Sequence, residues 1–510
     1  LAAEGVSVEQ GAVMLSAEGT YIIHGSLEGL SLVVDAPDDA KLQVVFDGVS
    51  IENSAAPAFL VKSADKVFLT LAEGSNNSLS DGAGRSDLTE SAESTGSVEG
   101  TESTESVEGT EDTESTEDAT LFSHDDLTIN GSGNLSVSSA SAHTIVSKDD
   151  LVITGGTFIL NAATDALQGK DCVKIAEGTF SITAGDDAIV STNIDEPNAA
   201  GFLSIDGGTF AINAVGDALH AETILRLSAG TINIASCEEG YEAAQIWIEG
   251  GEHTMVATDD GINAASDTRD DYLLDIVDGT LSITADGDGI DSNGGFTQSG
   301  GSVVINGPSD SANSALDAST LSISGGSMLA FGAAGMAQGF GEDSTQAALL
   351  YQLEREQPAG VVFGLYNVRG VELFAHTATK AFQSVVYSSP ELVLGESYTL
   401  RVDGEDLVSF TLTEAPALIS ADGTVSAYTG MGGFGGPGGG GGPGGGGTGG
   451  GAGGFGGEGT PPEGGTPPEG GGRPGGGAGS NGGTPPEGDF GAPNEGAPNA
   501  STPPVGEGAF

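Results

Sequence analysis

The feature that most restricts how this chain can fold is a segment of about 22 residues that recurs along much of its length. Each copy contains a short β-rich run, a turn at Gly-Gly or x-Gly, and a second β-rich run. Without insertions, successive copies begin 21 or 22 residues apart. A fixed period of this kind is typical of solenoid proteins. The clear copies occupy residues 151–162, 173–184, 203–214, 225–236, 273–285 and 321–331, and divergent copies occupy 246–257 and 296–307.

Apolar and polar residues alternate within the copies, as in Thr-Phe-Ser-Ile-Thr at 179–183. This alternation predicts strands with one buried face, and no helix-period segment between the copies supports a βαβ sheet. The sequence therefore predicts an all-β fold, a right-handed single-stranded parallel β-helix, in which each coil pairs only with its neighbours. Stacking would place five apolar side chains in one internal column: Phe158, Phe180, Phe210, Ile232 and Leu281.

Changes in composition divide the chain into five predicted parts. Residues 1–81 are less regular coils of the β-helix, and 119–340 form its core. Residues 341–428 contain longer strands, which predict a small C-terminal antiparallel β cap over the open end of the solenoid. The remaining two parts, an acidic Ser/Thr/Glu insertion at 82–118 and a Gly/Pro-rich tail at 429–510, have too little to bury and are predicted to be disordered.

A column of acids is predicted along the coils. Six successive copies carry an acid followed by a small residue and then an apolar residue, with His143 and Ser314 in the same position at the two ends. Equivalent positions on stacked coils lie about 4.8 Å apart, so neighbouring carboxylates would repel by roughly 3–4 kcal/mol at an effective dielectric of about 20. These six residues are called the acidic ladder: Asp165, Asp187, Asp217, Glu239, Asp260 and Asp288.

Calcium between the coils would remove this repulsion, because the ladder offers only oxygen donors, which favour calcium over zinc or copper. Asp150 and Asp171 at strand starts, and Asp291, are further candidate ligands. The alternative is that Asp-Gly and Asp-Ala only make turns, although this does not explain Glu239 in the same column. A bend must follow each acid, since a continuous strand would aim it into the core.

Charge excludes some classes of function. The chain has 14 Lys and Arg against 74 Asp and Glu, a formal net charge of -60. Such a chain cannot bind nucleic acid by neutralising phosphates, and it is unsuited to an anionic membrane surface. No apolar run is long enough to span a membrane. Cys172 and Cys237 fit no zinc or redox spacing, and the sequence leaves open whether they pair.

Several motifs resemble a bacterial carbohydrate-binding family described in clostridia. They are SHDDLTINGSGNLSV (123–137), SKDDLVITGGT (147–157), the D-[AG]-[IL] steps and GAAGMAQ (332–338). The resemblance runs from about residue 20 to 410 and implies a pectate-lyase-like β-helix that binds calcium along its coils and recognises cellulose and polygalacturonate. This chain departs from the family by the 82–118 insertion and by Ala, in place of Gly, after Asp165, Asp187 and Asp217.

We therefore expect a monomeric, non-catalytic, calcium-dependent carbohydrate-binding protein, extracellular or attached to the cell surface. Calcium would bridge its carboxylates to those of an acidic polysaccharide such as polygalacturonate, with cellulose as a further ligand. Neutral sugars need exposed aromatic platforms, for which Trp247, expected to point outward, and Tyr241 are the candidates. The alternatives are a polysaccharide lyase, for which Arg226 and Arg269 are the only arginines in the clear coils, and a surface adhesin or stalk.

Overall fold

The computed structural model of the protein describes residues 5–9, 11–82, 84, 117–194, 200–266 and 268–430, all within one compact unit, Leu1–Pro437. Apart from a few flanking residues, the insertion predicted at 82–118 and the tail predicted at 429–510 lie outside these residues, so both stay predictions. No helix among the described residues is long and apolar enough to cross a membrane.

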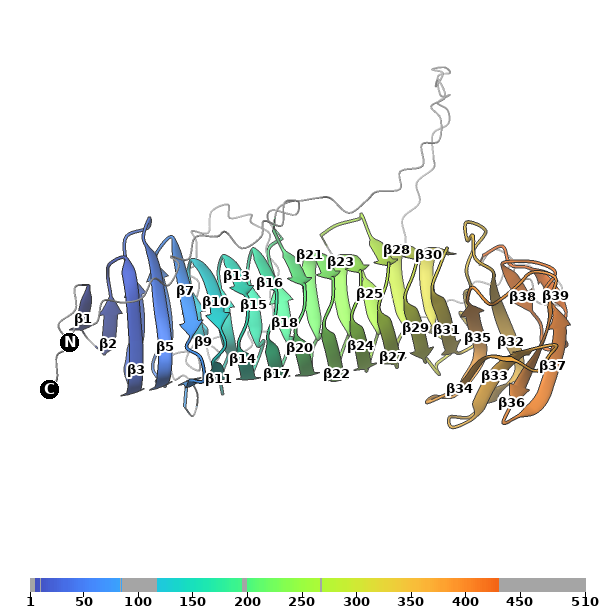
Figure 1. The fold of residues 1–510 in the computed structure, drawn as a ribbon, viewed down its shortest axis with the longest axis horizontal. Coiled ribbons are helices and arrows are strands. Elements are labelled where there is room, and N and C mark those ends of the chain that lie inside the picture. The colour runs from blue at the N-terminus through green and yellow to red at the C-terminus, as the bar shows by residue number, and fades with distance from the viewer. Residues whose placement is uncertain are drawn as a thin grey trace, which may run out of the picture. The chain divides into compact units, whose positions relative to one another are not determined.

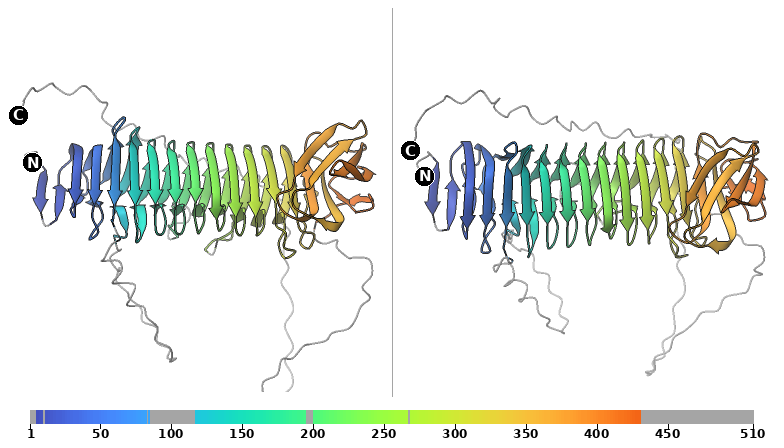
Figure 2. Two further views of the ribbon diagram at one scale, coloured as in Figure 1. Left: turned by 90° about the horizontal axis from the view of Figure 1, so that it is seen from below. Right: turned by 60° about the horizontal axis from the view of Figure 1, so that its bottom comes forward.

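The described chain winds into a parallel β-solenoid of about 11 turns, which confirms the predicted β-helix. Its right-handedness stays a prediction. The strand pairings form three parallel series along it, which we call three sheets, and Figure 2 shows the strands stacked coil by coil. The first sheet contains β2 (Ala12–Leu15), β4 (Ser31–Asp35), β6 (Phe59–Ser63), β9 (Ala119–Ser123), β12 (His143–Ser147), β15 (Leu167–Gly169), β18 (Ile189–Ser191), β25 (Ile262–Ala264) and the beginnings of β21 (Leu219–Leu227), β23 (Tyr241–Ile248), β28 (Ile290–Gln298) and β30 (Leu316–Ile323).

The second sheet continues each coil after the first. It contains β3 (Gly19–Glu28), β5 (Lys41–Glu52), β7 (Lys66–Leu71), β10 (Asp126–Gly131), β13 (Asp150–Ile153), β16 (Cys172–Ile175), β19 (Phe202–Ile205), β26 (Leu273–Ile276) and the ends of β21, β23, β28 and β30. Six strands thus serve two sheets each, because β21, β23, β28 and β30 join the first sheet to the second, and β3 and β5 join the second to the third. A register shift marks the corner, for instance between Ala221 and Ile224.

The third sheet follows the Gly-containing turn of each repeat. It contains β8 (Asn76–Ser80), β11 (Asn134–Ser138), β14 (Thr157–Asn161), β17 (Thr179–Thr183), β20 (Thr209–Asn213), β22 (Thr231–Cys237), β24 (Glu252–Ala257), β27 (Thr280–Ala285), β29 (Ser302–Asn306) and β31 (Ser327–Gly332). The turns use glycines with positive φ, such as Gly178 at 146° and Gly208 at 100°. A Cβ at Gly208 would lie 2.9 Å from the carbonyl oxygen of Gly178, so these turns stack closely.

The internal column was predicted correctly. Phe158 and Phe180 stack with ring centroids 4.8 Å apart, and Phe180 and Phe210 with centroids 4.6 Å apart. The column continues through Ile232 and Leu281, with His253 between them. His253 is buried and takes part in a 2.7 Å hydrogen bond with the Tyr241 hydroxyl.

The C-terminal part is antiparallel, as predicted, except for a parallel pairing between β32 (Ala348–Gln357) and β38 (Ala417–Ile419). β35 (Phe382–Ser388) pairs antiparallel with both β31 and β32. Beyond them a separate four-stranded antiparallel sheet has the order β34 (Glu372–Thr377), β33 (Val362–Asn367), β36 (Ser397–Val402) and β37 (Glu405–Thr411). The remaining strands are β1 (Val6–Glu9), antiparallel to β2, and the pair β38 (Ala417–Ile419) and β39 (Val425–Ala427).

Candidate functional site

The six residues of the acidic ladder lie in one column, directly before the first-sheet strands. The amide after each acid donates to the carbonyl oxygen of the acid on the next coil, as from Ala188 to Asp217 at 2.8 Å and from Gly261 to Asp288 at 2.8 Å. The same pattern holds at Ala and Gly steps, so the Ala residues that depart from the family keep the ladder's backbone geometry. A bend at Ala166 separates Asp165 from β15, which is the bend that the sequence required.

One carboxylate oxygen of most ladder residues helps to hold the coils together. Asp187 Oδ1 accepts a hydrogen bond from the backbone N–H of Asp217 at 2.7 Å, and Asp217 Oδ1 accepts one from Glu239 at 3.0 Å. Asp165, Asp260 and Asp288 accept from the following coil in the same way. The hydrogen bonds of these turns therefore occupy one carboxylate oxygen of each of these Asp residues and leave the second oxygen for other contacts.

Glu239 departs from this pattern because its side chain is one methylene longer. Its Oε1 accepts a hydrogen bond from Asn263 Nδ2 at 3.0 Å, while its Oε2 is buried and has no hydrogen-bond partner. Asn263 Oδ1 is also buried without a partner. A buried acceptor without a donor costs about 1–3 kcal/mol, so these two oxygens, on residues joined by a hydrogen bond, mark a position suited to a cation.

A second column lies three residues after the acids, and sequence reasoning missed most of it. The strand pairing aligns His220, Glu242, Asn263, Asp291 and Asp317 on successive coils. The two columns together form three groups whose possible ligand atoms lie within 4.8 Å of one another: Asp187, Asp217 and His220; Asp217, Glu239 and Glu242; and Asp288, Asp291 and Asp317.

The electrostatics of the ladder are those of crowded, partly buried carboxylates. Burial, followed by a hydrogen bond with Glu242 and the nearby acids, raises the pKa of Asp217 to about 8. Burial and the charge of Glu242 raise the pKa of Glu239 to about 8. Burial is also the main cause that raises the pKa of Asp260 to about 7 and that of Asp288 to about 6.

His220 supplies a positive charge to the middle of the ladder. Its Nδ1 lies 3.3 Å from Asp187 Oδ2, and its Nε2 lies 3.7 Å from Glu242 Oε2. Burial lowers the pKa of His220, but the hydrogen bond to Asp187 and the charges of Glu242 and Asp217 outweigh it and raise the pKa to about 9. The group of Asp288, Asp291 and Asp317 contains no basic residue.

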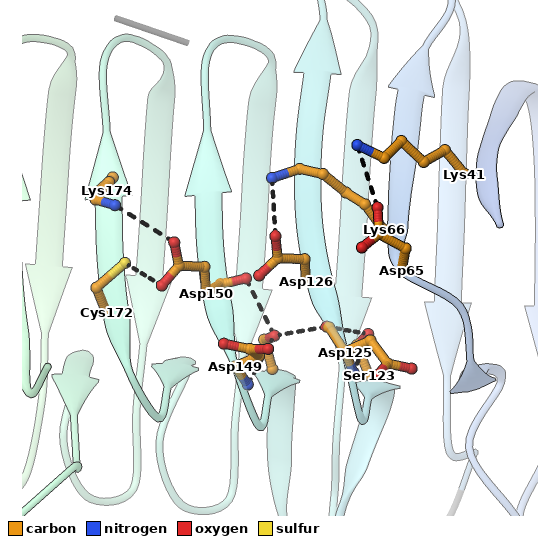
Figure 3. A network of polar contacts seen from close by, with 11 residues as sticks. Lys41, Asp65, Lys66, Ser123, Asp125, Asp126, Asp149, Asp150, Cys172 and Lys174 are labelled. Carbon is orange, nitrogen blue, oxygen red and sulfur yellow. Dashed lines mark hydrogen bonds and ion pairs between the residues drawn. The ribbon is translucent and has the colours of Figure 1, made fainter. Parts of the chain in front are cut away.

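Asp150 and Asp171, predicted as further ligands of the ladder, lie elsewhere. Asp150 begins β13 of the second sheet (Figure 3), and Asp171 directly precedes β16 of the same sheet. Asp150 accepts hydrogen bonds from Cys172 Sγ at 2.8 Å and Lys174 Nζ at 3.3 Å, and Asp171 accepts one from Asn193 Nδ2 at 2.6 Å. The structure thus does not bring them to the ladder.

Asp150 belongs instead to a separate acidic group with Asp126 and Asp149, whose possible ligand atoms lie within 4.8 Å of one another. Burial, followed by the charges of Asp126 and Asp171, raises the pKa of Asp149 to about 6. Two lysines neutralise part of the group: Lys66 contacts Asp126 at 3.1 Å, and Lys174 contacts Asp150. The doubled acid in Ser-Lys-Asp-Asp was the sequence signal for Asp149.

The expectation that Trp247 is exposed is wrong. Its neighbours Ile246 and Ile248 belong to the core, so the indole points away from the core, but only 4% of the residue is exposed. It is flanked by Arg226 and Asp275 on the adjacent strands. Tyr241 is 0% exposed, and its side chain lies in the core. Alternation fixes the direction of a side chain and not its exposure, so neither ring offers a platform to a sugar. Cys172 and Cys237 are both buried free thiols.

The fold and the ladder define this protein as a parallel β-solenoid with a carboxylate-rich column on its coils. Residues 9–269 match the family described as "Carbohydrate-binding domain-containing protein". A relative of that name from Acetivibrio thermocellus is 33% identical over 232 residues, which are 46% of this chain and 73% of the relative. The chain belongs to this carbohydrate-binding domain family. It is also similar to a solved structure, a polysaccharide lyase-like protein from C. thermocellum in a gadolinium derivative, with 30% identity, a TM-score of 0.39, and coverage of 46% of this chain and 85% of that chain.

Proposed function

We propose that this protein binds an acidic polysaccharide at the acidic ladder through calcium ions, without cleaving it, outside the cell or at its surface. The observation that carries the proposal is that two buried oxygens, Glu239 Oε2 and Asn263 Oδ1, have no donor among the described residues. Glu239 groups with Asp217 and Glu242, and Asn263 is hydrogen-bonded to Glu239. No protein N–H in this part of the chain donates a hydrogen bond to either of these two oxygens. Calcium binds several carboxylate and amide oxygens as ligands.

The residues present fit calcium at two places on the ladder. Asp217, Glu239 and Glu242 would hold one ion, and Asp288, Asp291 and Asp317 another. Carboxylate and amide oxygens are the only donors offered in these two groups, as calcium prefers. When bound, calcium supplies positive charge that a uronate carboxylate can approach. The chain's own residues fix the spacing of the ligands by the backbone hydrogen bonds between coils.

A binding role is favoured over a lyase role by the state of the two arginines. Arg226 donates to Glu249 at 2.8 Å, and Arg269 contacts Asp271. Each guanidinium is therefore engaged by a carboxylate that does not belong to the ladder. A lyase needs a base beside the metal-bound carboxylate, and these arginines do not meet that requirement.

The test is retention of the protein on immobilised polygalacturonate with calcium or with a chelator. We expect retention with calcium and release by the chelator. A variant with Asp217→Asn and Glu239→Gln should lose most of the calcium-dependent retention, while Asp206→Asn, a matched change at an exposed turn, should not. If the protein were retained equally well with calcium and with the chelator, the proposed role of calcium would be refuted. Absorbance from unsaturated products would establish the lyase instead.

A further inference from the structure

A hollow of about 620 Å³ lies where the last coils of the solenoid meet the C-terminal part of the chain. We call it the end hollow. Its walls are parts of β28 and β30, most of the segment 338–343 that follows β31, and residues 428–430. It lies wholly outside residues 9–269, which match the carbohydrate-binding domain family. Membership of that family therefore does not account for this hollow.

The path of the chain after β31 forms one side of the end hollow. The N–H of Gly341 donates to the carbonyl oxygen of Leu321 at 2.8 Å, and the N–H of Thr345 donates to that of Ile323 at 3.1 Å. Residues 341–345 therefore continue the pairing of the second sheet for part of another coil, although they form no strand. The end hollow lies beside this segment, at the corner between the first and second sheets.

Three buried polar side chains of the end hollow have unused hydrogen-bonding positions. Gln338, 5% exposed, donates through Nε2 to Asp317, but its Oε1 accepts no hydrogen bond from any described residue. The hydroxyl oxygen of Tyr428, also 5% exposed, accepts from the N–H of Gly339 at 3.1 Å, while its hydrogen has no acceptor in the described part of the chain. The same holds for the hydroxyl hydrogen of Ser292, which is 2% exposed. Buried polar groups are normally paired, so these three positions point to a ligand in the end hollow.

The charged groups of the end hollow are all acidic. No Lys, Arg or His lines it, whereas four carboxylates do: Asp291, Asp317, Glu342 and Asp343. Glu342 and Asp343 are exposed and make no ion pair with any described residue. A concave site with one sign of charge concentrates its field and raises the local concentration of the opposite charge. A ligand of the end hollow therefore carries positive charge.

Size and hydrogen-bonding capacity select the kind of cation. A volume of about 620 Å³ is within the range of about 300–1,000 Å³ for small-molecule sites, whereas one metal ion would leave most of it unfilled. A primary ammonium group has three donors and no acceptor, which matches the carboxylates and the unused Oε1 of Gln338. The hydroxyl hydrogens of Ser292 and Tyr428 need acceptors instead, and the oxygens of a sugar supply them.

We propose that the end hollow binds an amino sugar whose ammonium group is free. The ammonium lies among Asp291, Asp317 and Gln338 Oε1, and the sugar oxygens accept from Ser292 and Tyr428. This binding needs no metal, so it does not rest on the proposed function of the ladder. Asp291 and Asp317 also belong to a proposed calcium group, and calcium bound there should therefore compete with the ammonium.

The test compares three sugars of similar shape on the full chain, in a chelator, by ligand-observed NMR. Glucosamine carries the ammonium, N-acetylglucosamine has an uncharged amide in its place, and glucose has a hydroxyl. We expect glucosamine to bind with a Kd on the order of 1 mM, as is usual for so small a ligand. The other two sugars should bind about tenfold more weakly, because they lack the charge-assisted hydrogen bonds. Equal binding of all three, or no binding of glucosamine, overturns the proposal.

A first variant fills the end hollow. A Cβ at Gly341 would have only the carbonyl oxygen of Leu321 within 4 Å, at 3.4 Å, so Gly341→Leu can place its side chain in the hollow without backbone strain. This variant should lose glucosamine binding, while its thermal denaturation in chelator stays like that of the wild type. Glucosamine binding at the wild-type affinity would place the ligand elsewhere and overturn the proposal.

A second variant removes charge without filling the hollow. Glu342→Gln together with Asp343→Asn removes two exposed carboxylates and should weaken glucosamine binding by about three- to tenfold. Glu354→Gln together with Glu356→Gln, at two exposed positions of β32, removes the same charge elsewhere and is the matched control. An equal loss in the control would show a general attraction to the acidic chain and overturn the end hollow as the site.

Calcium separates this proposal from that of the ladder. Excess calcium should weaken glucosamine binding to the wild type, because both ligands use Asp291 and Asp317. If calcium has no such effect, although glucosamine binds in chelator, the proposed calcium group of Asp288, Asp291 and Asp317 fails and the end hollow stands.

Discussion

The acidic ladder and the outer face of the third sheet belong to the same coils and share one repeat, yet they are constrained differently. A ladder position is partly buried, and its carboxylate accepts a backbone N–H from the next coil, as Asp187 does from Asp217. A position on the outer face of the third sheet is exposed, and residues as different as Ile159 and Glu252 can replace the common threonine or serine. The fold therefore sets the spacing of both columns, whereas internal hydrogen bonds fix the chemistry of only one.

The largest effect is expected where both surfaces depend on one side chain. Phe180→Ala removes the middle ring of the stack formed with Phe158 and Phe210, which should lower the free energy of unfolding by about 3–5 kcal/mol. Chemical denaturation measures this loss. Ser181→Ala, at the exposed neighbouring position, is the control and should be nearly neutral. If the two variants changed the free energy of unfolding equally, the two surfaces would not share this stack as a common scaffold.

A second effect acts on the ladder alone, through pH. The pKa values of Asp217, Glu239, Asp260 and Asp288 are about 6 to 8 in the folded protein, against ordinary values of 3.8 for Asp and 4.5 for Glu. The protonated carboxyls therefore stabilise the fold below about pH 4, and this contribution is lost as the pH rises to 8. His220, raised from 6.5 to about 9, changes in the same direction. Without metal, the protein should melt at a lower temperature at pH 8 than at pH 5.

Calcium should reverse most of this loss at pH 8 and have less effect at pH 5, because the raised pKa values of Asp217, Glu239, Asp260 and Asp288 keep these four carboxyls largely protonated at the lower pH. Thermal denaturation with calcium or a chelator measures both effects. Potassium chloride of matched ionic strength is the control for screening. A metal-free protein that is more stable at pH 8 than at pH 5 would contradict the burial of these carboxyls.

A smaller effect is expected from a single ladder residue. Asp217→Asn keeps an Oδ1 that can accept a hydrogen bond from the Glu239 N–H, but it removes a carboxyl group whose pKa is raised to about 8. In chelator at pH 8 the variant should therefore be more stable than the wild type, by on the order of 1 kcal/mol, while the gain on adding calcium shrinks. Asp206→Asn should alter neither quantity. A destabilised Asp217→Asn protein in chelator would show that the carboxylate has a favourable partner even without metal.

The sequence predicted the parts of this molecule that follow from periodicity. It failed where a residue's role depends on its exposure or on contacts with residues of adjacent coils. The 22-residue repeat was enough for the solenoid, the Phe158, Phe180 and Phe210 stack, and the ladder column, because position within a repeat becomes position in space. Asp150 was grouped with the wrong column, since distance along a coil does not tell which corner a residue occupies. Glu242 was missed because the equivalent positions on other coils hold residues that are not acids, such as Gln168, His220 and Asn263, so no repeated acid marked this column.

The smallest predicted effect concerns a residue on neither surface. Trp247 is almost completely buried, and its Nε1 has no hydrogen-bond partner. Trp247→Phe removes this unsatisfied donor, which offsets part of the packing lost with the larger ring, so the free energy of unfolding should change by less than about 1.5 kcal/mol. Retention on polygalacturonate with calcium should stay at the wild-type level. A loss of that retention would place part of the binding surface on the second sheet, because Trp247 contributes nothing to the ladder.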